Sequence, residues 1–295
     1  MVLIAAQPFS PAAQLGVFRG DTGGKRRRRS FFPVPARNTI ENLRGCDAVK
    51  RLLATLSPSE PVQQADAWIV VDVLRATTTM VAFFDAGGEA LFPVGDVPDA
   101  FRLRGELGER CMLLGERECV KVPGFDAGNS PFEMTSAMIA RHPIAVMTTT
   151  NGTRAVQRAA GTGAIVLAGC CRNAAAVASR LEGLETVGIL SAGRLGRFAL
   201  DDTLCVGLIA DRIISRWRPD TADDGVLAAL DLYRTCAGGM EAGLRRAEHA
   251  LLLDRLGFSR DIAFAAEADV SRCAPELEER DGHACFALKA ARRPD

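Results

Sequence analysis

The sequence predicts an α/β fold, a three-layer α/β/α arrangement with a mostly parallel central sheet. Short apolar runs recur from Asp66 onward, and each is followed by a polar turn and then by a helical pattern. Apolar runs without alternation are typical of strands that are buried on both faces. Strands that alternate with helices form a parallel sheet with helices on both sides, which gives the three layers.

Four strand–turn–helix units carry this pattern. Their predicted strands span residues 67–71, 144–147, 164–168 and 186–190. The helices that follow end near Ala86, Ala160, Leu181 and Arg216. Residues 89–94 and 111–114 are predicted as two further strands.

The C-terminal part has a different pattern of predicted secondary structure. After Pro219 the chain is predicted to be mainly helical, through Leu256. The turn at Asp281 and Gly282 predicts a β-hairpin between residues 262 and 288, which we expect on the edge of the sheet.

The composition narrows the classes of function. Lysine plus arginine and aspartate plus glutamate balance at 36 each, so the net charge gives no indication of a nucleic-acid partner. Nine cysteines without a CxxC pair, and only three histidines, argue against a zinc site and favour reduced thiols in a cytoplasmic protein. No apolar run reaches the length of a membrane span, so no membrane partner is expected.

The first part of the chain lacks a core pattern. Residues 1–60 mix proline, glycine, arginine and polar residues without a sustained period. The basic run at 25–29 is not followed by the apolar stretch of an export signal. We therefore expect residues 1–60 to be a poorly ordered or atypical N-terminal extension and residues 61–295 to form one α/β domain.

The turn after the first strand of the four units is the first candidate site. Ligands of open parallel sheets bind beyond the carboxyl ends of the strands, where we expect the four turns to converge. A carboxylate there is costly unless it is paired or bound to metal, so Asp72 is placed to ligate Mg²⁺ or to attack phosphorus. Arg75 adds a bidentate anion donor, and Thr77 and Thr78 can cap a helix whose N–H groups suit a phosphate. The alternative is that Asp72 is a turn residue and the threonines only cap.

A second polar turn follows the strand at 144–147. Hydroxyls, an amide, a glycine and a guanidinium gather there, on Thr149, Asn151, Gly152, Thr153 and Arg154. The glycine lets the backbone approach an anion closely. The spacing is not that of a P-loop, and a polar capping box is the alternative.

Two segments between these turns add acids and donors. Glu116 and Arg117 follow an apolar strand, as Asp72 does. Asn129 and Ser130 precede a proline at a plausible helix start, which puts Glu133 in the first helical turn, facing a bound metal or the helix dipole.

The last unit contributes the adjacent acids Asp201 and Asp202. Such a pair is usually a helix N-terminal signature, and it can also complete the oxygen shell of Mg²⁺. None of the three histidines is expected to be a general acid. His249 is predicted to lie on the surface of a charged helix.

Several of these segments resemble the successive motifs of the 2-phosphosulfolactate phosphatase family. The motifs are VVDVLRATTT at 70–79, GER at 115–117, GFDAGNSPFE at 124–133 and TTTNGTR at 148–154. Further similarity lies in residues 192–202 and 256–262, so the resemblance covers residues 66 to about 288. The first 60 residues are unlike the short N-terminus of the family, and position 201 is Asp where Glu is expected.

The resemblance implies an α/β/α enzyme that uses Mg²⁺. Its reaction would be the hydrolysis of 2-phospho-3-sulfolactate to 3-sulfolactate and phosphate, a step toward coenzyme M. Residues 61–295 would then be a catalytic phosphatase domain that takes a small anionic phosphorylated substrate. Whether the chain forms a homo-oligomer stays open.

Our working hypothesis is metal-assisted phosphoryl transfer. Mg²⁺ would lie on Asp72 and on one or two of Glu116, Glu133, Asp201 and Asp202. Arg75, Arg154 and the threonine-rich turns would hold the phosphate oxygens, and either Asp72 or a water would attack phosphorus. The alternatives are a phosphatase for another small phosphorylated acid or sugar and a non-catalytic sensor of a phosphorylated metabolite.

Overall fold

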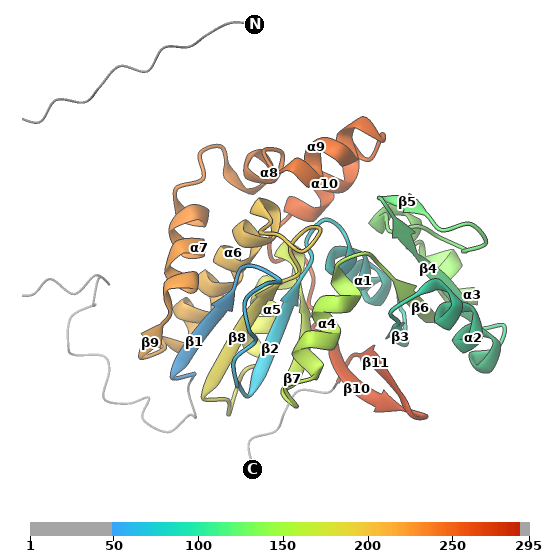
Figure 1. Ribbon diagram of the computed structural model, residues 1–295, viewed down its shortest axis with the longest axis horizontal. Helices are drawn as coiled ribbons and strands as arrows, with labels where there is room; N and C mark the ends of the chain where they lie inside the picture. The colour runs from blue at the N-terminus through green and yellow to red at the C-terminus, as the bar shows by residue number, and fades with distance from the viewer. Residues whose placement is uncertain (1–48, 290–295) are drawn as a thin grey trace, which may run out of the picture. The chain divides into compact units, whose positions relative to one another are not determined.

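One large sheet organises the part of the chain that the structure describes. The computed structural model describes residues 49–289, drawn in colour in Figure 1. Within these residues eleven strands follow one another across the sheet in the order β5-β4-β6-β3-β11-β10-β7-β2-β8-β1-β9. Their bounds are β1 Arg51–Thr55, β2 Ala67–Val71, β3 Ala90–Pro93, β4 Cys111–Arg117, β5 Val120–Lys121, β6 Ile144–Thr148, β7 Ile165–Gly169, β8 Thr186–Ser191, β9 Thr221–Ala222, β10 Glu276–Arg280 and β11 His283–Ala287.

Helices cover both faces of the sheet, so the predicted α/β/α class and all four strand–turn–helix units are confirmed (Figure 1). The α-helices are α1 Ala76–Asp85, α2 Val97–Leu107, α3 Ser136–Arg141, α4 Gly152–Ala160, α5 Ala174–Ser179, α6 Leu200–Trp217, α7 Asp224–Arg234, α8 Gly239–Leu244, α9 Glu248–Arg255 and α10 Ser259–Ala266. Two 3₁₀ turns lie at η2 Pro131–Glu133 and η3 Cys171–Asn173. No helix within residues 49–289 has both the length and the apolar character that a bilayer crossing requires.

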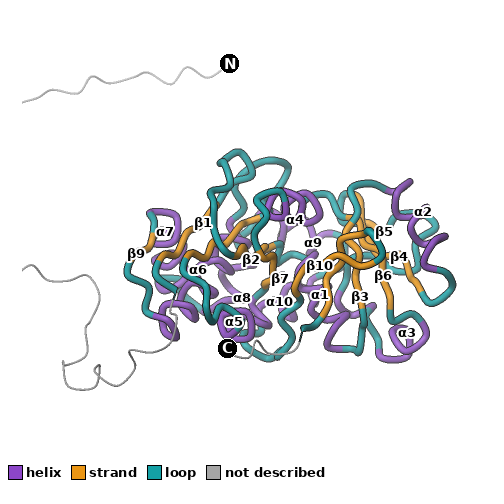
Figure 2. Tube along the Cα trace, turned by 90° about the horizontal axis from the view of Figure 1, so that it is seen from below, coloured by secondary structure: helices purple, strands orange, loops and turns teal. Residues whose placement is uncertain are grey.

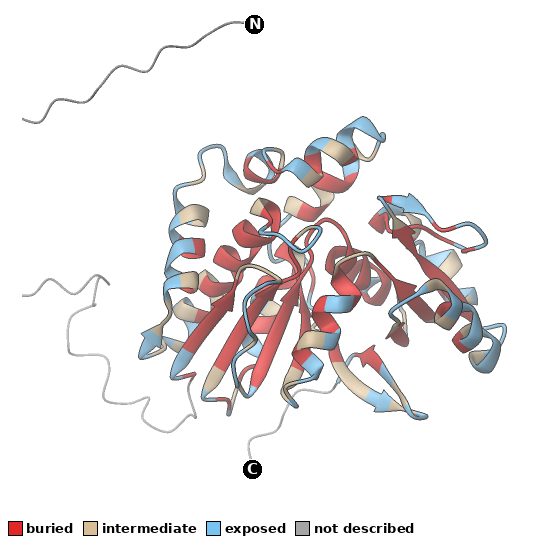
Figure 3. Ribbon diagram, in the orientation of Figure 1, coloured by how far each residue is buried: buried red, intermediate tan, exposed pale blue. Residues whose placement is uncertain are grey.

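The strands are apolar throughout because both faces of the sheet are packed. In β2, Ile69 and Val71 belong to the core that also holds buried residues of α5, α6 and α7. Trp68 and Val70 point the other way, into a core shared with α1 and α4. This two-residue alternation is the pleat of a strand, and it makes each central strand a buried layer (Figure 3).

The sheet consists of two parallel groups joined by the C-terminal hairpin. Strands β1, β2, β7, β8 and β9 form one parallel group, and β3, β4 and β6 form the other. The hairpin of β10 and β11 pairs antiparallel with β7 on one side and with β3 on the other. The predicted hairpin is confirmed, but its predicted place on the sheet edge is wrong, because both of its outer sides have a partner strand.

The hairpin also decides where the carboxyl ends of the strands meet. The pairing makes the two parallel groups run in opposite senses, so in a flat sheet their carboxyl ends would lie at opposite edges. Each group joins the hairpin through a single residue pair, Glu276 with Leu167 and Phe286 with Leu91. The sheet turns at this sparse junction (Figure 2), and the end of β6 thereby reaches the end of β2. A Cβ atom placed on Gly152 after β6 would lie 2.8 Å from Oδ2 of Asp72 after β2.

The predicted boundary at residue 60 is too late. Strand β1 pairs in parallel with β8 along its whole length and with β9 at its start. Leu52 and Leu53 are fully buried, one in each of the two cores. The sequence pattern missed this strand because its five residues stand alone, without a following helix at the usual distance. The expectation of poor order in residues 1–48 lies outside the described residues.

Candidate active site

Asp72 lies at the carboxyl end of β2, where the N-terminus of α1 holds it. Its Oδ1 accepts a hydrogen bond from the Ala76 N–H at 3.1 Å, and the Thr77 hydroxyl donates to its backbone carbonyl at 2.9 Å. The side chain is buried, with the residue 7% exposed. Oδ2 has no hydrogen-bond partner among residues 49–289. The position after a buried strand therefore supplies one fixed and one free carboxylate oxygen.

Three further acids, Glu116, Asp201 and Asp202, lie near Asp72. The pKa shifts of Asp72 and Asp202 show that these charges are close to one another. The pKa of Asp72 is raised from 3.8 to about 6, mainly by burial and also by the charges of Glu116 and Asp201, while His249 and the Ala76 N–H act in the opposite direction. Burial, Asp201 and Asp72 also raise the pKa of Asp202 well above its ordinary value. A pocket that crowds carboxylates in this way favours a bound cation.

Asp202 ties two strand ends together. Its Oδ1 accepts the Val73 N–H at 2.9 Å, and its Oδ2 accepts the Gly193 N–H at 2.9 Å and faces the Ser191 hydroxyl at 3.3 Å. Because it lies in the first turn of α6, it joins the turn after β2 to the turn after β8. Its oxygens are thus occupied by the protein.

Glu116 makes a similar tie on the other parallel group. Its Oε1 accepts the Thr150 N–H at 2.9 Å and its Oε2 accepts the Cys119 N–H at 2.8 Å. The hydroxyl of Thr150 is buried and has no hydrogen-bond partner within the described residues. A buried polar atom without a partner is uncommon, and here it belongs to a residue that lines a cavity.

Glu133 is bonded to its own turn. Both of its oxygens accept the Gly128 N–H, at 3.0 Å, and one also accepts the Ser130 N–H at 3.2 Å. The predicted position of Glu133 in the first helical turn is confirmed, and its carboxylate takes part in a capping box there. The predicted role as a metal ligand has no support, since its carboxylate is used by the turn.

Arg75 does not point a free guanidinium at an anion. Its Nη1 donates to Asp261 on α10 at 2.6 Å, and its Nη2 donates to the Cys119 carbonyl at 2.9 Å. The guanidinium also lies 4.3 Å from the centre of the Phe258 ring. We assign Arg75 to holding α10 against the site, rather than to binding substrate as the sequence suggested.

The threonines of α1 are also used by the backbone. The Thr77 hydroxyl bonds Asp72, the Thr78 hydroxyl donates to the Val73 carbonyl at 2.7 Å, and the Thr79 hydroxyl donates to the Asn129 carbonyl at 2.9 Å. They shape the turn that presents Asp72.

Asn129 and Ser130, the two predicted residues just before η2, differ in whether their side-chain oxygen has a hydrogen-bond partner. The Asn129 Oδ1 atom is buried without a partner in the described part of the chain, and so remains a candidate for substrate binding. The Ser130 hydroxyl donates to Asp261 at 2.8 Å, which is a structural contact.

Hydrogen bonds within the second polar turn, and one to Leu195, occupy several of the polar groups of this turn. Thr149 and Thr153 bond each other, because the Thr153 hydroxyl donates to the Thr149 carbonyl at 3.0 Å. The Asn151 Oδ1 atom accepts the Leu195 N–H at 3.2 Å. Gly152 permits the close approach to Asp72, whereas Arg154 is exposed and faces neither cavity described next.

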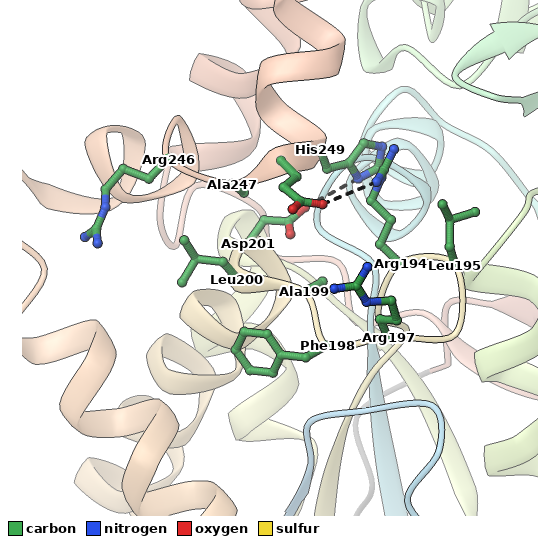
Figure 4. Close-up of a pocket in the computed structure, with 11 residues that line it drawn as sticks. Arg194, Leu195, Arg197, Phe198, Ala199, Leu200, Asp201, Arg246, Ala247 and His249 are labelled. Carbon is green, nitrogen blue, oxygen red and sulfur yellow. Dashed lines mark ion pairs between the residues drawn. The ribbon is translucent and has the colours of Figure 1, made fainter. Parts of the chain in front are cut away.

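Two cavities open beside the acids. One of about 560 Å³ is lined by Glu116, Arg117, Thr150, Asn151 and His249, among others. One of about 300 Å³ is lined by Asp201, Arg197 and Phe198, among others (Figure 4). Arg194, Leu195 and His249 line both cavities. Asp72 lines neither cavity, but it is close enough to Glu116 in the first and Asp201 in the second for their charges to raise its pKa.

His249 on α9 is the residue that the sequence missed. Its Nδ1 lies 3.4 Å from Asp201 Oδ2, and its side chain is only 15% exposed (Figure 4). Burial lowers its pKa, but its contacts with Asp201 and Cys119 outweigh this and raise the pKa from 6.5 to about 10. The predicted surface position is wrong, because α9 packs over the site. No local motif marks this histidine.

The sequence is similar to proteins of one known family. A family model described as 2-phosphosulpholactate phosphatase matches residues 54–280. Proteins named "Probable 2-phosphosulfolactate phosphatase" are similar over most of the chain. The one from Thermus thermophilus is 38% identical over 244 residues, covering 81% of this chain and 100% of its own. The one from Symbiobacterium thermophilum is 37% identical over 229 residues, covering 77% and 97%.

The chain belongs to the 2-phosphosulfolactate phosphatase family. Membership makes it an enzyme of the phosphoric monoester hydrolase class, since a phosphatase cleaves a phosphate monoester. The matched residues include the turn with Asp72, the cluster of acids and α9 with His249. The family resemblance inferred from the motifs is therefore confirmed. In this member of the 2-phosphosulfolactate phosphatase family, the predicted acids Asp72, Glu116, Asp201 and Asp202 do come together. The carboxylate of Glu133 is used by its own turn, and Arg154 is exposed and lines neither cavity.

Proposed function

We propose that this chain hydrolyses 2-phospho-3-sulfolactate, or a closely similar 2-phosphohydroxy acid, to the hydroxy acid and phosphate, as a step toward coenzyme M. The observation that carries the proposal is Asp72, a buried carboxylate with a free oxygen among three other acids, in a chain of this family. We place the reaction in the cytoplasm, which agrees with free thiols at all eight described cysteines.

Mg²⁺ is part of the proposal, and the donor set fits a sparse magnesium site. Within residues 49–289, no three His, Cys, Asp or Glu side chains form an arrangement that could hold a metal ion by themselves. Mg²⁺ commonly takes only one or two carboxylates and completes its shell with water and substrate phosphate oxygens. Asp72 would hold the ion through its free oxygen. When bound, the ion would neutralise negative charge on the phosphate.

The protein side chains supply the rest of the chemistry. The free Thr150 hydroxyl would donate to a phosphate oxygen, because Thr150 lines the larger cavity and the hydroxyl has no partner among the described residues. Arg117, Arg194 and His249 line the same cavity and would offset the charge of a substrate with several anionic groups. Asp72 either attacks phosphorus or orients the attacking water. Trapping of a phosphorylated Asp72 would decide for direct attack.

Release of inorganic phosphate from a substrate panel tests the function. The panel contains 2-phospho-3-sulfolactate, 2-phospholactate, a sugar phosphate and an aryl phosphate, each with Mg²⁺. We expect the highest kcat/KM for 2-phospho-3-sulfolactate. A higher value for the sugar phosphate would assign a different substrate class, and saturable binding without phosphate release from any compound would make the protein a sensor.

A further inference from the structure

Cys119 lies at the end of a hydrogen-bonded chain that reaches into the site. Its Sγ is 3.4 Å from Nε2 of His249, and the other ring nitrogen of His249 is 3.4 Å from Asp201. A nucleophile within reach of a base that is itself oriented by a third group is the arrangement that activates thiols. The proposed hydrolysis makes no use of this thiol.

The backbone holds the thiol in place. Cys119 has a φ of 67° and follows Glu118 at 54°, so the turn is in the left-handed region at two successive non-glycine residues. The Cys119 N–H donates to Glu116 and the Cys119 carbonyl accepts from Arg75. Its orientation toward His249 is therefore fixed by contacts at both ends of the residue.

Cys119 borders a cavity, although little of the residue is exposed to solvent. Cys119 is 6% exposed and lines the cavity of about 560 Å³. Val120, Leu252 and Leu256 form an apolar part of the same wall. A small neutral reagent can lie against this apolar part of the wall, because it loses little hydration there.

The other described thiols differ from Cys119. Burial raises the pKa of Cys111 and Cys273 to about 11 and that of Cys170 to about 12, which disfavours their reactive thiolate forms. Cys236 is half-buried, but its Sγ contacts a backbone carbonyl, at 3.6 Å. Among the thiols in residues 49–289, Cys119 is the one in contact with an imidazole.

We propose that Cys119 is a modification site, at which small neutral electrophiles, including hydroperoxides, form an adduct that blocks the larger cavity. The blocking effect on turnover rests on the proposed phosphatase function, whereas the reactivity of the thiol does not. The imidazolium of His249 stabilises the Cys119 thiolate, whose proton has gone to solvent, and Asp201 holds the ring in position.

The thiol can react with an alkylating reagent or with a hydroperoxide without a further co-reactant. With iodoacetamide, the sulfur attacks the methylene carbon, the S–C bond forms, the C–I bond breaks and iodide leaves with the electron pair. With hydrogen peroxide, the sulfur attacks one oxygen and the O–O bond breaks. The hydroxide that leaves takes a proton from His249 and becomes water. The sulfur is oxidised to a sulfenic acid and the peroxide is reduced.

Site-resolved labelling of the folded, full-length protein tests the reactivity. Limiting iodoacetamide at pH 7 is followed by peptide mass spectrometry, which gives a rate for each cysteine. We expect Cys119 to be labelled at least about tenfold faster than the more exposed Cys236. His249→Asn should bring the Cys119 rate down to that of Cys236, and His249→Gln serves if the Asn variant does not fold. His142→Asn is the control, since His142 contacts the Glu109 carbonyl and should leave both rates unchanged.

Peroxide inactivation tests the consequence for the site. Each variant is compared with its own untreated activity. The parent should lose activity as dimedone reports sulfenic acid at Cys119, and Cys119→Ser should resist. Equal labelling of Cys119 and Cys236, or a Cys119 rate unaffected in both His249 variants, would overturn the modification site. Full activity after complete modification of Cys119 would overturn the blocking. If the untreated protein releases no phosphate, the proposed function fails, and the labelling still decides the reactivity.

Discussion

Arg75 and Asp261 form a buried ion pair that joins the turn after β2 to α10. The Nη1–Oδ2 distance is 2.6 Å, and the two side chains are 2% and 3% exposed. Asp261 also accepts from the Ser130 hydroxyl, so it connects three segments that are far apart in sequence. The site thus depends on a contact between the first motif of the chain and a late helix.

We predict that Asp261→Asn or Arg75→Met destabilises the fold by about 3–5 kcal/mol, because each leaves the other charge buried without its partner. The free energy of unfolding in urea measures this. Arg154→Met is the matched control, since the Arg154 side chain is exposed and surface changes usually stay within about 0.5 kcal/mol. Similar stability of all three variants would show that the ion pair does not hold α10.

Asp72→Asn should separate activity from stability. We expect turnover to fall at least about a thousandfold, roughly 4 kcal/mol of transition-state stabilisation, because Asn can neither hold a cation strongly nor attack phosphorus. Steady-state phosphate release measures this. A folded variant that keeps most of its turnover would remove Asp72 from the mechanism.

The same variant should be more stable than the parent in a metal-free buffer. Above the raised pKa of about 6, Asp72 is charged in both states, and the folded protein bears the full cost of burying that charge. Below its ordinary value of 3.8 the group is neutral in both states and the cost is absent. Near pH 7 the variant should gain about 1–3 kcal/mol, and the gain should shrink as the pH falls from 6 to 4. Urea unfolding in EDTA at several pH values measures it, and a loss of stability would contradict it.

Magnesium should be required for turnover and should stabilise the parent protein. EDTA should abolish phosphate release, and Mg²⁺ or Mn²⁺ should restore it. Binding to the folded state also raises the melting temperature, and Asp72→Asn should lose this shift. Full turnover in chelator would exclude metal assistance, and an equal shift in both proteins would place the ion away from Asp72.

Arg194 should contribute to the choice of substrate, because it lines both cavities. Arg194→Gln should lower kcat/KM for the multiply charged acid more than for an aryl phosphate, by about 1.5–3 kcal/mol in the ratio. Arg154→Gln, outside both cavities, is the control. An equal loss toward both substrates in Arg194→Gln would assign Arg194 to the phosphoryl group alone.

Strand β1 should be required for folding, and truncation of the chain tests this. A chain that begins at residue 61 lacks β1. This removes one of the two partner strands of β8 and the partner strand of β9, and it leaves part of two cores exposed. We expect it to fail to fold. A chain that begins at residue 49 keeps β1 and every strand pairing of the described residues, and should retain a cooperative melting transition by circular dichroism. A folded 61–295 fragment would show that β1 is dispensable.

Much of the chemistry was visible in the sequence because it lies in local motifs. A buried apolar strand followed by an aspartate predicted both β2 and the position of Asp72. The helix start after Ser130 was likewise a local signal, although it also suggested Glu133 as a metal ligand, whereas the turn itself uses that carboxylate. Local patterns predict which elements form, because strand burial and helix capping depend on neighbouring residues.

The tertiary structure decided which of these polar groups are free to act. Arg75 looked like an anion donor until Asp261 was brought to it by α10, and His249 looked like a surface residue until α9 placed it between Asp201 and Cys119. The convergence of the two parallel groups depends on a sparsely paired hairpin, and no motif marks its place inside the sheet. The sequence by itself determined the α/β class, the family and the central aspartate. The partners of each charge come from distant segments, and only packing in three dimensions can assign them.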